Sequence, residues 1–136
     1  MKAINSRTFA KDHYYPKVVR AVDELLADKG MVVPVDVFVK LGFLFELGLE
    51  DWRSGKAKSL EEVLRCDGVK AMRLLEILRL HARDRKLKAT AVPYLVERRG
   101  RRYLLRFSKK DDPTFEKAFS HHFVPMAAAV VHGAAS

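Results

Sequence analysis

The chain has 136 residues, 49% of them apolar and 32% charged, which is the balance of one globular domain and excludes a disordered segment. The single cysteine, Cys66, excludes an internal disulfide, and the N-terminus lacks the apolar stretch of a secretory signal, so we expect a cytoplasmic protein. Residues 124–131 form an apolar stretch that Pro125 interrupts and that is shorter than the ~20 residues of a bilayer span, so we expect no membrane partner.

Residues 1–15 show no clear period and are expected to form an N-terminal arm that packs late or stays mobile. A helix is predicted from Pro16 up to Gly30, since apolar residues recur there at helical spacing. A shorter helix is predicted over residues 34–41, with Gly42 as its stop. Residues 50–54 are expected to form one or two helical turns around Trp52, a side chain that we assign to packing.

Ser59-Leu60-Glu61-Glu62 has the pattern of a capping box, which predicts that a helix begins at Leu60. Asp67-Gly68 has turn chemistry, and after it an apolar face of period 3.6 predicts a longer helix over residues 69–87. The apolar stripe of this longer helix is wide enough for a central core helix. The sequence therefore predicts a short helix, a tight turn and a long helix.

After residue 90 the period changes to that of strands, because residues 92–97 and 102–107 alternate about Gly100 and predict a β-hairpin near 92–108. Asp112 as N-cap and Pro113 then predict a helix that continues through Phe123 and is closed by Pro125. Residues 126–136 are expected to form a C-terminal tail. The predicted fold is a single domain over residues 16–125, mainly α with one β-hairpin (α+β), whose helical core carries a winged-helix-like hairpin.

The excess of positive charge lies in one segment of the chain. The formal net charge is +9, from 26 basic and 17 acidic residues. Residues 79–110 contain twelve basic and two acidic side chains, so this segment carries +10 and the rest of the chain carries −1. Such clustering favours a polyanionic partner over a uniformly charged surface.

The candidate binding residues come from this basic segment. The hairpin tip carries four arginines, and the last turns of the long helix are expected to present an exposed basic edge; the full set is Arg98, Arg99, Arg101, Arg102, Arg79, Arg83 and Lys86. The planar guanidinium group binds phosphate oxygens in pairs and stays charged at any relevant pH. We therefore expect a nucleic-acid-binding protein, with DNA favoured over RNA, that contacts phosphates through the hairpin tip and the adjacent helix edge.

Two other functions stay open at this stage. The basic face could bind an acidic partner protein, and a homodimer is compatible with either binding function. A metal-dependent nuclease is less favoured, because His121 and His122 on a helix would point about 100° apart and no known metal-ligand spacing occurs. No catalytic set and no phosphate-binding glycine loop is present, so we expect a protein without a cofactor, and a binding protein rather than an enzyme.

Single reactive side chains have structural explanations as well. Asp67 beside Cys66 would raise the pKa of the thiol and favour an inert cysteine. Glu97 lies alone among the arginines, and we expect it to be a cross-strand partner of one of them rather than a catalytic carboxylate.

Three short blocks carry a resemblance to other proteins. They are Asp51-Trp52-Arg53-x-Gly55, Leu105-Arg106-Phe107-Ser108-Lys109 and His122-Phe123-Val124. Together they are similar to a group of uncharacterised bacterial proteins, to which no activity is attached, over residues 36–124. This resemblance implies a bacterial, cytoplasmic origin.

Overall fold

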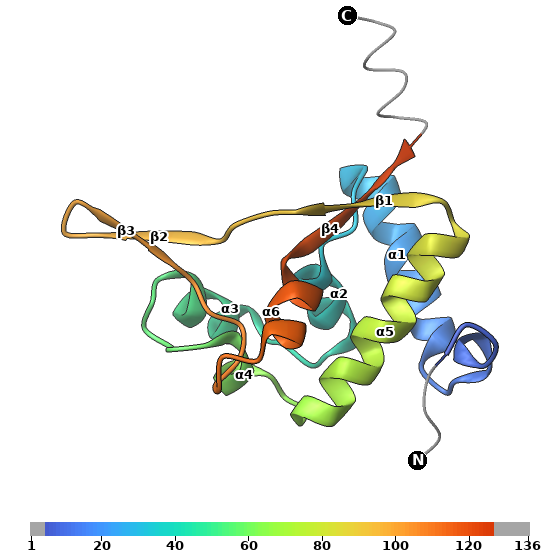
Figure 1. Ribbon diagram of the computed structural model, residues 1–136, viewed down its shortest axis with the longest axis horizontal. Helices are drawn as coiled ribbons and strands as arrows, with labels where there is room; N and C mark the ends of the chain where they lie inside the picture. The colour runs from blue at the N-terminus through green and yellow to red at the C-terminus, as the bar shows by residue number, and fades with distance from the viewer. Residues whose placement is uncertain (1–4, 127–136) are drawn as a thin grey trace, which may run out of the picture.

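The structure, a computed structural model, describes residues 5–126 of the chain (Figure 1). Most of its helices and strands contribute to one hydrophobic core, and the predicted mainly helical α+β domain is confirmed. The elements are, in chain order, the 3₁₀ helix η1 (Phe9–Lys11), α1 (Tyr15–Lys29), α2 (Pro34–Leu41), α3 (Glu46–Arg53), α4 (Leu60–Val63), α5 (Gly68–Asp84), β1 (Leu87–Ala91), β2 (Leu95–Arg98), β3 (Arg101–Leu104), α6 (Pro113–Ser120) and β4 (His121–Pro125).

Helices α1 and α2 begin and end within one residue of the predicted positions. Each has a proline in its first turn, where the missing N–H group is not needed by the helix. Each ends at a glycine with a left-handed φ, 71° at Gly30 and 84° at Gly42. Because glycine adopts this conformation without a Cβ clash, these two positions stop the helices as the sequence predicts.

Helix α3 is longer than predicted, because it begins at Glu46 instead of residue 50. Phe45 precedes it in an extended conformation and its side chain is 54% exposed. The last turn of α3 places Trp52 in the core with no exposed surface, which confirms the assignment of this side chain to packing.

Helix α4 begins at Leu60 as predicted, but the capping box does not form. Ser59 Oγ is buried without a hydrogen bond among the described residues, and Glu62 Oε2 accepts a hydrogen bond from Lys58 N at 3.0 Å. The reason is that Glu61 N, which an N-cap side chain could satisfy, already donates to the main-chain oxygen of residue 107 at 2.9 Å. A tertiary contact has therefore replaced the local cap.

Helix α5 is the core helix that the sequence predicts. Asp67 caps its N-terminus by accepting a hydrogen bond from Lys70 N at 2.7 Å. The helix packs against α1, α6 and β1, and its buried side chains are Ala71, Leu74, Leu75, Ile77, Leu78, Leu80, His81 and Ala82. It ends at Asp84 rather than at Leu87, because Leu87 already begins strand β1.

The predicted C-terminal helix is wrong over residues 121–125. Helix α6 ends at Ser120, and the following residues form β4, which pairs antiparallel with β1 so that Leu87 lies opposite Pro125. Phe123 at the centre of β4 also exchanges two hydrogen bonds with Val32, at 2.8 and 2.9 Å. Burial of Phe123 and pairing on both sides of the strand stabilise the extended conformation over a further helical turn.

The described part of the N-terminal arm packs against the domain. Phe9 is 4% exposed, and the buried carboxylate of Asp12 forms an ion pair with Arg73 of α5. Asp12 also accepts a hydrogen bond from Tyr14 N at 2.8 Å, so the arm leads directly into α1. Of the predicted C-terminal tail, residues 127–136 lie outside the described residues. In the part of the chain that is described, no helix has the length and apolar character to cross a membrane.

Candidate nucleic-acid interface

Strands β2 and β3 form the predicted hairpin, which projects from the body of the molecule (Figure 1). Its turn consists of Arg99 and Gly100, with φ values of 51° and 77°. Positive φ at both central residues is the type I′ geometry that matches the twist of a hairpin. An arginine is uncommon at such a position, where asparagine and glycine are favoured, so the turn carries its charge at a conformational cost.

Main-chain hydrogen bonds hold the base of the hairpin to the α4 region. The carbonyl oxygen of Arg106 accepts from Trp52 Nε1 at 2.7 Å and from Leu60 N at 3.0 Å. The carboxylate of Glu116 in α6 accepts from the main-chain N–H groups of Phe107 and Ser108 at 2.6–3.1 Å. Leu105 N still donates across the hairpin to Tyr94 O at 2.7 Å, whereas residues 106–108 use their main chain for these contacts and not for hairpin pairing. The strands are therefore shorter than predicted.

An aromatic cluster lies beneath the same base. The ring of Trp52 lies 5.3 Å from that of Tyr94 and 5.0 Å from that of Phe107, measured between centroids. Tyr94 Oη lies 2.7 Å from His122 Nε2, and burial raises the pKa of Tyr94 to about 12. The cluster therefore joins α3, the end of the hairpin and β4, and the three short sequence blocks around Trp52, Phe107 and His122 meet here.

The register of the hairpin divides its arginines between two faces. Arg98 lies opposite Arg101, and Val96 opposite Tyr103, so these side chains share one face. Arg102 lies opposite Glu97 on the other face, as expected for a cross-strand partner. The four tip arginines thus consist of a pair on one face, one side chain on the other face, and Arg99 in the turn.

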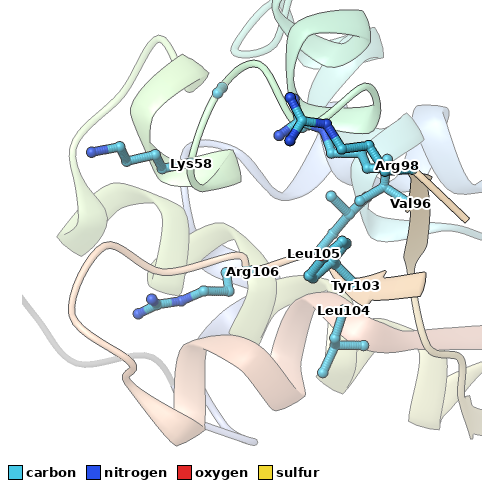
Figure 2. A pocket seen from close by; sticks show the side chains of 10 residues that line it. Lys58, Val96, Arg98, Tyr103, Leu104, Leu105 and Arg106 are labelled. Atoms are coloured by element: carbon cyan, nitrogen blue, oxygen red, sulfur yellow. The ribbon is translucent and has the colours of Figure 1, made fainter. Parts of the chain in front are cut away.

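The face that carries Arg98 borders a cavity of about 800 Å³ between the hairpin and the loop that joins α3 to α4. We call it the hairpin groove, and its lining residues are Gly55, Ala57, Lys58, Val96, Arg98, Arg99, Tyr103, Leu104, Leu105 and Arg106. Figure 2 shows Arg98 extending toward the loop, with Lys58 and Arg106 at the other end of the groove. The groove is therefore lined by four cationic side chains and by no acidic one.

The guanidinium group of Arg98 lies directly over Gly55. A Cβ atom at Gly55 would be 3.0 Å from Arg98 Cζ, and the φ of Gly55 is +82°. Glycine therefore allows both the left-handed turn of the loop and the close approach of the arginine. This contact directs the exposed side chain of Arg98 toward the groove.

Few of the charges of the groove are neutralised by neighbours. Among residues 5–126, Lys58, Arg98 and Arg99 form no ion pair, while Arg106 pairs with Asp111. Arg98 and Arg101 lie opposite each other across the strands, where like charges destabilise a hairpin. An anion bound between them would relieve this repulsion.

The predicted helix edge does not adjoin the hairpin. Strand β1 leads the chain away from the C-terminal end of α5, so that the hairpin tip and this helix end lie toward opposite ends of the long axis (Figure 1). Arg79 and Arg83 are exposed on α5, with Arg79 Nε donating to Glu76 Oε1 at 2.9 Å. Lys86 follows the helix in a left-handed conformation with a φ of 57°. The seven predicted site residues therefore form two separate groups.

The three other groove residues with polar or charged side chains were not among the predicted site residues: Lys58, Tyr103 and Arg106. Lys58 is 40 positions before Arg98, and nothing in the sequence indicates that the α3–α4 loop faces the hairpin. Tyr103 and Arg106 lie in the predicted hairpin, but only the place of Tyr103 in the groove follows from the pairing register. A register prediction could have found Tyr103, although not Arg106 or Lys58.

The structure places His121 and His122 on a strand rather than on the predicted helix, and it leaves Cys66 half-buried. His121 and His122 are on β4, where successive side chains point to opposite faces, so they diverge more than on a helix. Over residues 5–126 no group of three His, Cys, Asp or Glu side chains could hold a metal ion. Burial raises the pKa of the Cys66 thiol; Lys70 opposes this shift and Asp67 adds to it.

The buried His81 and the partly buried His122 make the stability of the domain depend on pH. Burial lowers the pKa values of His81 and His122 below their ordinary value of 6.5. Between the lowered and the ordinary pKa the unfolded chain binds more protons than the folded one, so the free energy of unfolding falls as the pH falls below about 6.5. We expect urea denaturation to show this loss between about pH 7.5 and 5.5, and a His81→Gln, His122→Gln variant to lose less stability over that range. Equal losses in both proteins would contradict the assignment to these two histidines.

Comparison of the chain with protein-family models, curated proteins and solved structures finds no match.

Proposed function

We propose that this protein binds nucleic acid, with DNA as the expected target, by contacting phosphate groups with its hairpin. One observation carries the proposal, namely the gathering of basic side chains around the hairpin groove without a lining carboxylate. Arg98, Arg99, Lys58 and Arg106 come from two separate parts of the chain, so the charge is concentrated by the fold and not only by the sequence. A projecting element with such a surface can follow a phosphate backbone.

Electrostatics also supports this function. A phosphate group spreads its negative charge over several oxygens, and a guanidinium group can bind two of them through parallel hydrogen bonds. A bound phosphate would reduce the repulsion between the opposed side chains of Arg98 and Arg101. Its attraction to Arg99 would also offset the conformational cost of the left-handed backbone at that residue. Because Arg79, Arg83 and Lys86 lie away from the hairpin, the proposal assigns the primary contact to the hairpin alone.

A second candidate is supported by the other face of the hairpin. Leu95 and Leu104 lie opposite each other there and are 50% and 66% exposed, beside Arg102. Apolar side chains next to a charge are typical of a protein contact, so an acidic partner protein could bind this face. Binding of such a partner would depend on Leu95, which does not line the groove, whereas phosphate binding would not.

Fluorescence anisotropy of a labelled oligonucleotide tests the proposal. We expect the wild-type protein to bind duplex or single-stranded DNA with an affinity that falls steeply between about 50 and 200 mM salt. The slope for each phosphate neutralised should be about −0.9 on a duplex and about −0.7 on a single strand. RNA of the same sequence, measured in parallel, tests the preference for DNA. Absence of binding to every nucleic acid at the lowest salt would contradict the proposal and would favour the acidic partner protein.

A further inference from the structure

The hairpin groove contains an aromatic side chain among its cations. Tyr103 lines the groove, its side chain is 48% exposed, and it lies on the same hairpin face as Arg98 and Arg101. Resting on the proposed function, we infer that the groove binds an unpaired nucleic-acid strand, with a base stacked on Tyr103 and the adjoining phosphates held by the cations around it.

The surroundings of Tyr103 suit a flat, partly apolar group. Val96 lies directly opposite Tyr103 in the register, and Leu105 follows two positions later on the same face. Both line the groove, so the tyrosine ring is bordered by aliphatic surface and not by polar side chains alone (Figure 2). A nucleobase has two apolar faces and polar edges, and an aromatic ring that is open to solvent on one side offers it a stacking platform.

The cations lie where a phosphate backbone that continues from such a base would pass. Arg98 and Arg101 are next to Tyr103 toward the tip in the strand register. Lys58 and Arg106 line the far end of the groove (Figure 2). The guanidinium group of Arg98 already packs over Gly55, which lessens the ordering required of it on binding. The groove thus has cationic side chains on both sides of its aromatic ring.

The concave shape favours an unpaired strand over a duplex. In a duplex both faces of each base are covered by the neighbouring bases, so a tyrosine could stack only after a base pair had been opened. A volume of about 800 Å³ is that of a pocket for a small ligand, large enough for a nucleotide. A duplex would meet the rim of the groove and leave Tyr103 without a partner.

The experiment compares affinities for oligo-dT, oligo-U and a duplex DNA of the same length, by anisotropy at low salt. We expect the wild-type protein to bind a single strand more tightly than the duplex. Tyr103→Ala should weaken single-strand binding by about fivefold to a hundredfold, the range for loss of one stacked base. Tyr103→Phe should bind as the wild type does, because stacking uses the ring and not the hydroxyl. Comparison of the affinities for oligo-dT and oligo-U shows whether the groove prefers an unpaired DNA or an unpaired RNA strand.

Leu95→Ala is the matched control, since Leu95 is 50% exposed on the other face of the same hairpin. We expect this variant to bind a single strand with wild-type affinity and to unfold at the same urea concentration as Tyr103→Ala. Duplex binding equal to or tighter than single-strand binding would overturn the inference and leave the proposed function standing. Equal losses for Tyr103→Ala and Leu95→Ala would also overturn it. Absence of salt-sensitive binding to all three oligonucleotides would overturn the proposed function itself.

Discussion

Replacing Trp52 with alanine is expected to lower the free energy of unfolding by about 3–5 kcal/mol, the range for deleting a large aromatic side chain from a core. Trp52 has no exposed surface, and its ring packs against Tyr94 and Phe107. Its Nε1 also donates the 2.7 Å hydrogen bond to the carbonyl oxygen of Arg106, at the base of the hairpin. Urea denaturation followed by circular dichroism would measure the loss.

Trp52→Phe separates packing from the hydrogen bond. This variant keeps an aromatic ring, and the Arg106 oxygen keeps the hydrogen bond from Leu60 N at 3.0 Å, so we expect a smaller loss than for alanine. If Trp52→Ala were within about 0.5 kcal/mol of the wild type, as surface substitutions usually are, the position of Trp52 in the core would be wrong.

Changing Arg98, Arg99, Arg101 and Arg102 together to alanine is expected to abolish most nucleic-acid binding. If each arginine neutralises one phosphate, the salt slope should become shallower for each residue removed by about 0.9 on a duplex or about 0.7 on a single strand. A charged hydrogen bond contributes about 1.5–3 kcal/mol, so the affinity at low salt should fall by more than about a hundredfold. Anisotropy against the same oligonucleotide at several salt concentrations measures both quantities.

The matched control for this change is the second basic group. The variant Arg79→Ala, Arg83→Ala, Lys86→Ala removes three exposed charges that lie away from the hairpin. We expect it to retain most of the wild-type affinity, with a small loss from the lower net charge. A loss as large as that of the hairpin variant would mean that any basic surface suffices, and it would contradict assignment of the site to the hairpin.

The helices were predictable from sequence because their signals are local. Gly30 and Gly42 end α1 and α2, and Asp67 caps α5 within three residues of its own position. The strands β1 and β4 were not predictable, since residues 87–91 pair with residues 121–125 and their hydrogen bonds depend on contacts across the chain. The same long-range effect replaced the cap at Ser59 by contacts from residues 106 and 107.

The candidate site was predictable only in part, for the same reason. The tip arginines follow from a hairpin signal that lies within a few residues of Gly100. The opposite wall of the groove, with Gly55 and Lys58, comes from the loop between α3 and α4. The residues that flank this loop, Trp52 and Leu60, donate hydrogen bonds to the carbonyl oxygen of Arg106. The prediction that the basic edge of α5 lies beside the hairpin was wrong. Strand β1, which advances about 3.3 Å per residue, separates the end of α5 from the hairpin.

Comparison of Arg98→Ala with Arg102→Ala measures most directly whether nucleic acid binds the groove face of the hairpin. Both changes remove one exposed arginine from the same paired strands, but Arg98 lines the groove and Arg102 lies on the other face. We expect Arg98→Ala to weaken binding by about tenfold, the lower end of the range for a charged hydrogen bond, and Arg102→Ala to weaken it less. Equal losses, or a larger loss for Arg102→Ala, would contradict a binding site in the groove.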